Sequence, residues 1–244
     1  MSSLSASPQK NCIFGRRKGR PLRKTKTALL TDLFPSLEFQ LTSEEKLPLS
    51  LFKEKKPLWI EIGYGTGDHL ISQMKEHPYC NFIGCEPFLG GIASFLEKLS
   101  SSNLSHEKIR LFTQDARLLL KSLDTNSVEK IFILFPDPWP KKKHHKRRFF
   151  QQETLSEIIR TLIPGGTLVL ASDHENYYES MEALALKNKS LILQEQGVLP
   201  NSKETSLRPF AWPMSRFEFK AHQAHRQCRY IILQKHPSSL LNKG

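Results

Sequence analysis

The sequence predicts an α/β fold built on a doubly wound, mostly parallel β-sheet. Five short apolar segments alternate with helix-like segments between residues 58 and 172, and none is joined to the next by a hairpin-length turn. The fourth segment, residues 128–138, is apolar almost throughout, as expected for a strand covered on both faces. In such sheets ligands bind beyond the carboxyl ends of the strands, where the strand order reverses.

The elements are expected in alternating order from Leu58. The helix over 149–163 must end at Pro164-Gly165-Gly166, because proline cannot donate a backbone hydrogen bond. Near the C-terminus, residues 191–196 and 228–235 also predict strands. The alternating strands are expected at 58–63, 81–87, 108–114, 128–138 and 166–172, and the helices at 67–77, 89–101, 116–123, 149–163 and 176–188.

The net charge of +12 on 244 residues is concentrated in two segments. Residues 1–30 contain eight Lys/Arg and residues 141–148 contain six, without any acid, whereas the rest of the chain is nearly neutral. Such patches indicate a polyanionic partner, the alternative being a solvated tail and a solubilising loop. We therefore expect a basic, flexible arm (1–30), a linker (31–57), one folded domain (58–236) and a C-terminal tail (237–244).

Composition also restricts the compartment and the cofactors. No apolar run is long enough to cross a bilayer, so we expect neither a membrane span nor a secretory segment. The four cysteines form no CxxC pair, which argues against a disulfide framework and favours a cytoplasmic location. His222, His225 and Cys228 have a suggestive spacing but lack an evident fourth ligand, so no metal is expected. Both a monomer and a homodimer remain open.

A glycine-rich turn and an acid follow the first two strands. Gly63, Gly65 and Gly67 form G-x-G-x-G, which permits a tight turn and close approach of a ligand, although an ordinary strand-to-helix turn is the alternative. Glu86 ends the second strand, where a carboxylate can accept hydrogen bonds from both ribose hydroxyls of a nucleoside. These positions predict a nucleoside-containing cofactor.

The charge around the glycines discriminates between such cofactors. Glu61 and Asp68 flank the turn, and their negative charge would repel a pyrophosphate but attract a sulfonium group. Asp115 follows the third strand and could accept a hydrogen bond from an adenine amino group. The acids at successive strand ends therefore favour S-adenosylmethionine over NAD or ATP.

The most distinctive segment is FPDPWP, residues 135–140, which ends the fourth strand and leads directly into KKKHHKRR. Two prolines fix the backbone around Asp137, and Trp139 offers an aromatic face for stacking. A rigid acid, an aromatic plate and a cationic run suit one nucleobase within a folded RNA. A stiff turn with a buried tryptophan is the alternative.

These motifs together resemble the bacterial tRNA (guanine-N7-)-methyltransferases over most of residues 15–235. The resemblance implies a Rossmann-like class I methyltransferase fold whose final strand is antiparallel, with S-adenosylmethionine as cofactor and tRNA as partner. FPDPW followed by a basic run is the most specific of the motifs, and the others are common among S-adenosylmethionine enzymes. The motifs are GRRKGRPLRK, EIGYGTG, IGCEP, QDA, FPDPWPKKKHHKRR, ASDHENY and RPFAWPMSRFE.

The resemblance also implies roles for individual residues. Asp137 falls on the residue taken as catalytic, and the family's usual Thr-Lys-Phe-Glu is replaced here by residues 215–218, which keep the hydroxyl, the positive charge and the acid. The acids that fall on the cofactor site are Glu61, Glu86, Asp115 and Asp137. The residues that fall on guanosine or tRNA contacts are Lys141, Asp173, Ser215, Arg216, Phe217 and Glu218. The RNA-contacting segment comprises Lys143, His144, His145, Lys146, Arg147 and Arg148.

The reaction that the resemblance implies is methyl transfer to N7 of the guanine at position 46, in the tRNA variable loop. Guanine N7 carries a lone pair and no proton, so alignment rather than a general base is needed, and Asp137 would stabilise the positive charge that develops on the base. Asp173 could read the guanine N1–H and N2–H edge. The alternatives are a non-catalytic RNA-binding protein and an NAD-dependent oxidoreductase, which would need the G-x-G-x-x-G fingerprint that the glycine turn lacks.

Overall fold

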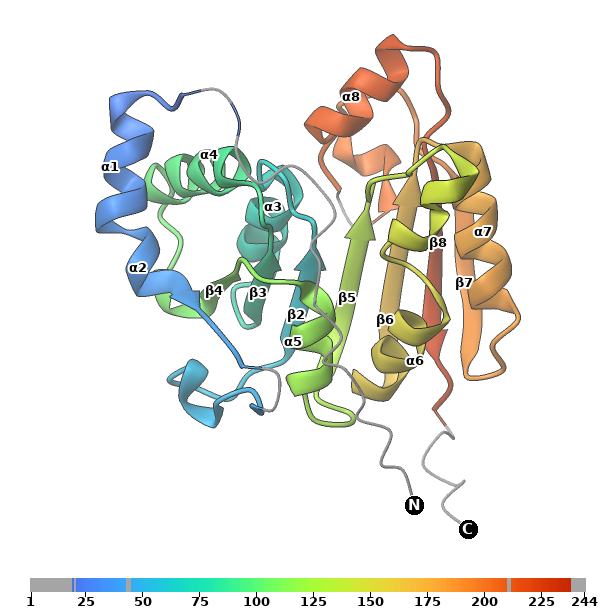
Figure 1. Cartoon of the computed structure of the whole chain (residues 1–244), viewed down its shortest axis with the longest axis horizontal. Helices are drawn as coiled ribbons and strands as arrows, with labels where there is room; N and C mark the ends of the chain where they lie inside the picture. Colours follow the sequence, from blue (N-terminus) through green and yellow to red (C-terminus); the bar gives the residue numbers. More distant parts are fainter. Residues whose placement is uncertain (1–18, 20, 43–44, 210–211, 238–244) are drawn as a thin grey trace, which may run out of the picture.

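The structure, a computed structural model, describes residues 19, 21–42, 45–209 and 212–237, and within them eight strands form one sheet in the order β1-β4-β3-β2-β5-β6-β8-β7 (Figure 1). Neighbours among β1 to β6 are parallel, and β8 runs antiparallel to both β6 and β7. The predicted mostly parallel sheet with a final antiparallel strand is confirmed. The strands are β1 (Glu38–Phe39), β2 (Leu58–Ile62), β3 (Asn81–Cys85), β4 (Ile109–Phe112), β5 (Val128–Leu134), β6 (Leu162–Ser172), β7 (Leu191–Val198) and β8 (Arg229–Lys235).

The strand order reverses between β2 and β5. The chain proceeds from β2 outward through β3 and β4, then returns to pair β5 with the other side of β2, in register at Ile60↔Ile131 and Ile62↔Ile133. The loops that follow β2 and β5 therefore leave the sheet side by side at the reversal point, which is where open α/β sheets bind ligands.

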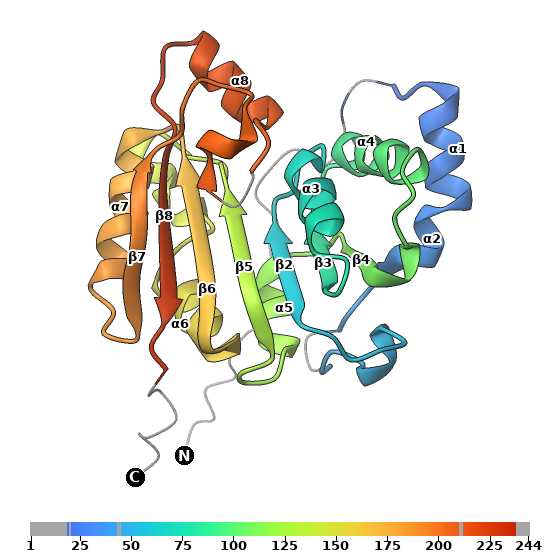
Figure 2. The same ribbon diagram turned by 180° about the vertical axis from the view of Figure 1, so that it is seen from behind.

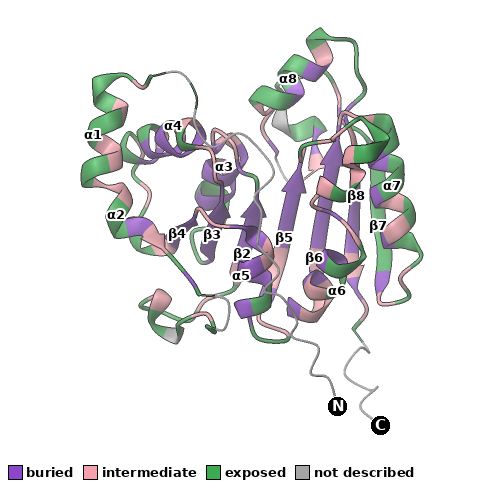
Figure 3. Ribbon diagram, in the orientation of Figure 1, coloured by how far each residue is buried: buried purple, intermediate pink, exposed green. Residues whose placement is uncertain are grey.

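Helices cover both faces of the sheet (Figures 1 and 2). The helices α5, α6 and α7 pack on one face, and α3 and α4 pack on the other, so each face has its own apolar core. Figure 3 shows the central strands buried between these layers, which explains why β5 is apolar along most of its length. These helices are α3 (Asp68–Glu76), α4 (Leu89–Ser100), α5 (Ala116–Ser122), α6 (Gln152–Thr161) and α7 (Glu175–Leu186).

The helix predicted over 149–163 is shorter than expected, and its predicted stop at Pro164 is wrong. It ends at Thr161, and β6 already begins at Leu162, so the Pro-Gly-Gly sequence lies inside a strand. The register with β5 shifts between Val128 and Lys130, and Gly165 has φ of 78°. An irregular stretch of strand can accommodate a proline that a regular central ladder would exclude.

The segment before β2 is more ordered than the sequence suggests. Residues 24–30, expected to belong to a flexible arm, form most of α1 (Lys24–Asp32), and α2 (Phe34–Leu37) and β1 occupy part of the expected linker. Lys26 Nζ donates to Ser94 Oγ at 2.8 Å and lies 3.3 Å from Glu97, so α1 docks on α4. Residues 1–18 and 20 of the expected arm, and 238–244 of the expected tail, lie outside the described residues.

The C-terminal part adds a helix that the sequence analysis does not predict, α8 (Arg216–Gln223), between β7 and β8. Figures 1 and 2 show α8 beyond the carboxyl ends of β5 and β6. The described part of the chain contains no helix that is long and apolar enough to span a membrane. Short 3-10 turns complete the structure: η1 (Leu49–Leu51), η2 (His106–Lys108), η3 (Lys142–Arg147) and η4 (Thr205–Leu207).

Candidate active site

The glycine turn joins β2 to α3 at the reversal point of the sheet. Gly63, Gly65 and Gly67 have φ of 80°, 55° and 74°, in the left-handed region that favours glycine. At Gly67 a side chain is also excluded by packing, because a Cβ there would lie 2.4 Å from the ring of buried Phe95. A Cβ on Gly63 would meet nothing within 4 Å, so there is open space beside the turn.

Glu86 connects the glycine turn to the end of β3. Its two carboxylate oxygens accept hydrogen bonds from the backbone N–H groups of Gly65, at 2.8 Å, and Phe88, at 2.9 Å. Burial raises the pKa of Glu86, the two N–H groups oppose this effect, and the charges of Asp137 and Glu61 raise it further. This carboxylate is therefore held rigidly beside the glycine turn.

The other two acids near the turn already have partners. Glu61 Oε2 lies 2.8 Å from Nδ1 of His69, and both side chains are buried. Asp68 forms an ion pair with Lys98, whose Nζ also donates to the Thr66 carbonyl oxygen at 2.8 Å. The negative charge expected from Asp68 is thus offset by Lys98.

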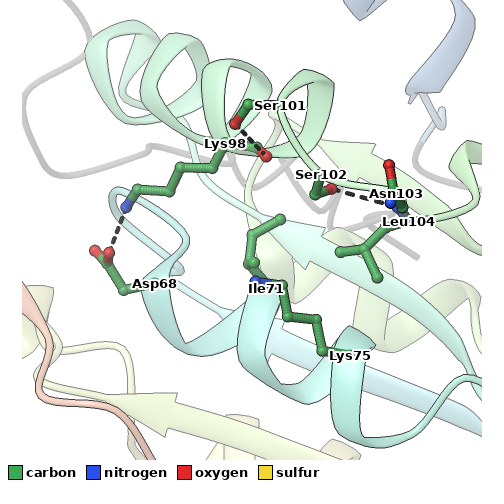
Figure 4. Close-up of a pocket in the computed structure, with 8 residues that line it drawn as sticks. All are labelled: Asp68, Ile71, Lys75, Lys98, Ser101, Ser102, Asn103 and Leu104. Atoms are coloured by element: carbon green, nitrogen blue, oxygen red, sulfur yellow. Dashed lines mark hydrogen bonds and ion pairs between the residues drawn. The ribbon is translucent and has the colours of Figure 1, made fainter.

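A groove of about 580 Å³ lies next to this ion pair, between α3 and α4 (Figure 4). Lys75 and Ile71 line it from α3, and Ser101 and Ser102 line it from the end of α4. Asp68 lines it, whereas none of Glu61, Glu86, Asp115 and Asp137 does. The groove is therefore separate from the row of strand-end acids.

Asp115 begins α5 at the end of β4. Its Oδ1 accepts a hydrogen bond from the Arg117 backbone N–H at 2.9 Å, and its Oδ2 lies 3.1 Å from the Arg117 guanidinium. This is a helix N-cap, which also fixes the direction of the carboxylate. The structure therefore places Asp115 at the predicted strand end and gives it a role in the fold.

The segment after β5 has an unusual backbone at each end. Phe135 has φ of 53° and Trp139 has φ of 44°, which is rare for aromatic residues and typical of functional sites. Phe135 N–H donates to the Ala171 carbonyl oxygen at 2.9 Å, so the segment is fixed to β6. Asp137 lies exposed between them, and partial desolvation raises its pKa.

The basic run forms η3 and folds back onto Trp139. The Arg147 guanidinium lies 5.0 Å from the Trp139 ring centre, and the His144 ring meets that ring edge-on at 6.0 Å. Trp139 is therefore partly covered by the run rather than left open for stacking. The pKa of His144 is lowered by desolvation and then by neighbouring cations, which include Arg147.

The expectation that Arg148 contacts RNA is not compatible with its position. Only 4% of Arg148 is exposed. Its Nε donates to the Pro138 carbonyl oxygen at 2.9 Å, its Nη2 donates to Asn176 Oδ1 at 2.9 Å, and its guanidinium stacks on Tyr177 at 4.6 Å. Arg148 therefore anchors the Asp137 segment from behind, whereas Lys143 and Lys146 remain exposed.

The remaining predicted substrate residues lie in three places: at the start of η3, after β6 and at the start of α8. Lys141 is exposed at the start of η3, and Asp173, after β6, forms an ion pair with Arg226 at 2.9 Å. Ser215 caps α8, and the Phe217 ring lies over the glycine turn, since a Cβ on Gly65 would be 3.0 Å from it.

Arg216 and Glu218, the last two predicted substrate residues, differ sharply in how far their side chains are exposed. Arg216 is exposed, whereas Glu218 is completely buried in an ion pair with Arg208. Sequence reasoning misses the residues that hold the predicted acids, among them His69, Lys98, Arg117, Arg208 and Arg226. Arg208 lies in the RPFAWP motif, but nothing in the sequence signals the others as partners.

The sequence matches the family described as "Putative methyltransferase" over residues 55–229. The solved structure of the 16S rRNA methyltransferase KamB matches with a TM-score of 0.53 and 11% identity, covering 77% of this chain and 92% of that chain. An antibiotic-related methyltransferase matches with a TM-score of 0.51 and 16% identity, covering 81% and 96%. At these identities the likeness concerns the fold alone. The fold and the family match define the class of protein, a methyltransferase.

Two relatives narrow this class. The tRNA (guanine-N(7)-)-methyltransferase of Rhizobium meliloti (strain 1021) is 37% identical over 96% of this chain and 100% of the relative. The enzyme of the same name from Rhodospirillum rubrum is 35% identical over 92% of this chain and 88% of the relative. The chain belongs to the tRNA (guanine-N(7)-)-methyltransferase family. The resemblance predicted from the motifs is therefore confirmed.

Proposed function

We propose that this protein transfers a methyl group from S-adenosylmethionine to N7 of the guanine at position 46, in the variable loop of tRNA. One observation carries the proposal: the glycine turn after β2 and the Asp137 segment after β5 meet at the reversal point of the sheet. A cofactor site and a rigid acid are thereby next to each other. Membership of the family supports the substrate.

The residues around the glycine turn fit S-adenosylmethionine. The space beside Gly63 is open, and a carboxylate oxygen that accepts one backbone N–H retains a lone pair, so Glu86 can still bind the ribose hydroxyls. Asp115, fixed by Arg117, would accept from the adenine amino group. When bound, S-adenosylmethionine supplies an electrophilic methyl group on a positively charged sulfur. The nearby charge of Asp137, together with Glu86, favours that cation.

Asp137 would stabilise charge rather than remove a proton. Guanine N7 attacks with a lone pair, and the methylated base is a cation, so the charge to be stabilised grows along the reaction. The rigid backbone on both sides of Asp137 fixes its carboxylate before the base arrives. Desolvation raises the pKa of Asp137 in the free protein, and a positive charge developing on the base would lower that pKa.

Asp173 would identify the base as guanine. Its present partner, Arg226, is 48% exposed, and exposed ion pairs are weak enough to be exchanged. A guanine that presents N1–H and N2–H could replace the guanidinium, whereas adenine would leave the carboxylate unpaired. The exposed cations Lys141, Lys143 and Lys146 would bind phosphates and orient the tRNA.

The experiment uses a tRNA transcript, purified protein and S-adenosylmethionine with a labelled methyl group. Mass spectrometry of nuclease fragments should locate one N7-methylguanosine at position 46, and a transcript with adenine at that position should incorporate no label. Methylation of another nucleotide would overturn the proposed site. Absence of incorporation, together with heat stabilisation by NAD but not by S-adenosylhomocysteine, would instead support an oxidoreductase.

A further inference from the structure

Arg208 is the most highly connected buried cation among the described residues. Its side chain has no exposed surface. Its Nε donates to the Trp212 carbonyl oxygen at 2.6 Å, and its Nη1 donates to the carbonyl oxygens of Pro200 at 3.1 Å and Ser202 at 2.9 Å. One guanidinium therefore ties Pro200 and Ser202, after β7, to Trp212, before α8.

The fourth contact of Arg208 joins this loop to α8. Its Nη2 donates to Oε1 of Glu218, whose side chain is also without exposed surface. Three residues earlier, Ser215 Oγ accepts from the Glu218 backbone N–H at 3.2 Å, which makes Ser215 the N-cap of the helix. The Ser-x-x-Glu sequence therefore fixes the start of α8 through both of its polar residues.

The start of α8 lies against the candidate cofactor site. The Phe217 ring covers the Gly65 turn, and a groove of about 430 Å³ is lined jointly by Asp68 from α3 and by Ser215 and Arg216 from α8. A shift of α8 would move these side chains relative to the glycine turn. Because one misplaced ångström can reduce a rate by about a hundredfold, the position of α8 matters to the reaction.

We infer that Ser215 and Glu218 are positioning residues that hold α8 over the glycine turn, with Arg208 as their buried anchor. This role rests on the proposed function, and it differs from the substrate contact that the family resemblance implies for Glu218. Phe217 and Arg216, which are exposed on the same turn, are the members of the segment that can face the tRNA.

Arginine suits the anchor position because its planar group carries five N–H donors in a fixed arrangement. The three carbonyl oxygens and one carboxylate bound by Arg208 lie in different directions, and the three donors of a lysine could not reach them all. Arg208→Lys keeps the charge and removes this geometry. The variant therefore separates positioning from simple charge neutralisation.

The competing possibility is that Glu218 itself contacts the guanine. Its second oxygen, Oε2, has no hydrogen-bond partner among the described residues, so a movement of α8 could direct it to the N2–H of the base. Under that alternative Glu218 would contribute to recognition of guanine. Under our inference the recognition belongs to other groups, and changes at Glu218 affect all substrates alike.

The first measurement is amide hydrogen exchange in the free protein, which requires neither activity nor tRNA. In Arg208→Lys and Ser215→Ala the amides of α8 should exchange at least about tenfold faster than in the wild type, while those of β2 and β5 stay unchanged. The control is Arg160→Lys, because Arg160 also joins a glutamate, Glu157, and two backbone carbonyl oxygens, but on α6. Unchanged exchange in α8 of Arg208→Lys would overturn the inference.

The second measurement compares transcripts that carry guanine or inosine at the target position. Inosine retains N7 but lacks the N2 amino group, so the ratio of the two kcat/KM values reports contact with that group. Arg208→Lys should reduce kcat/KM by about ten- to a hundredfold on both transcripts. Glu218→Gln, which retains an oxygen to accept from Arg208, should cause a smaller loss and leave the ratio unchanged.

The outcomes show whether Glu218 positions α8 or contacts the guanine, and they test the proposed function separately. A collapsed guanine-to-inosine ratio in Glu218→Gln, with normal exchange in α8, would show that Glu218 contacts the base. If the wild type methylates neither transcript, the proposed function fails, and hydrogen exchange alone still decides whether Arg208 holds α8.

Discussion

The close approach of α4 to the glycine turn makes Gly91→Ala a sharp test of the candidate cofactor site. A Cβ at Gly91 would lie 2.5 Å from the Gly65 carbonyl oxygen and 3.3 Å from Cγ of Glu86. To restore an ordinary contact of 3.4 Å, the turn must move by about 0.9 Å. One methyl group thus displaces both the turn and the acid that is hydrogen-bonded to it.

The cost to stability should be small, and the cost to binding should be large. Overpacking costs about 1–3 kcal/mol, and alanine returns up to about 1 kcal/mol of helix propensity, so we expect a net loss of about 1 kcal/mol. A displacement near 1 Å should weaken binding of the cofactor by about ten- to a hundredfold, or about 1.4–2.7 kcal/mol. Isothermal calorimetry with S-adenosylhomocysteine gives the affinity, and thermal unfolding gives the stability.

Gly90→Ala is the matched control, one residue earlier in the same helix. Its Cβ would lie 2.8 Å from the ring of Phe88, a side chain that can move, rather than from backbone. This variant should bind S-adenosylhomocysteine nearly as well as the wild type. If Gly91→Ala binds it as tightly as Gly90→Ala does, the glycine turn does not hold the cofactor.

Two other sites give further predictions. Asp137→Asn should lower turnover while the affinity for tRNA stays within about twofold, because the interaction of Asp137 with the base strengthens only in the transition state. Desolvation raises the pKa of Asp137 in the folded state, so ionisation of this residue lowers the stability of the fold as the pH rises from about 4 through that pKa. The melting temperature of Asp137→Asn should therefore exceed that of the wild type at pH 7 and match it at acidic pH. Replacing Lys142, Lys143 and Lys146 by glutamine should weaken the binding of all tRNAs alike. It should also reduce the slope of log affinity against log salt concentration by up to about 2.7. Removing residues 1–23 should have a smaller effect. A salt titration with slopes equal to that of the wild type would identify these lysines as solvated surface.

The sequence alone determined the fold class, the succession of strands and helices from Leu58 to Ser172, and the family. Alternation of apolar strands with amphipathic helices is a local property, and so is the apolar character of β5, so both can be recognised without tertiary contacts. The FPDPWP segment and the glycine turn were recognisable for the same reason, since prolines and closely spaced glycines restrict the backbone where they stand. Residues 24–30 and α8 escaped prediction because their polar sequences gain order only by docking on the body.

Only the tertiary structure decided which charged side chains are paired or buried within the fold and which are exposed to a ligand. Glu61 with His69, Asp68 with Lys98 and Asp173 with Arg226 pair across elements, and such pairs depend on the order of strands rather than on spacing along the chain. Composition counts a basic residue in the same way whether it is exposed or buried. Arg148 therefore seemed to belong with the phosphate-binding lysines, whereas packing against Tyr177 makes it part of the scaffold.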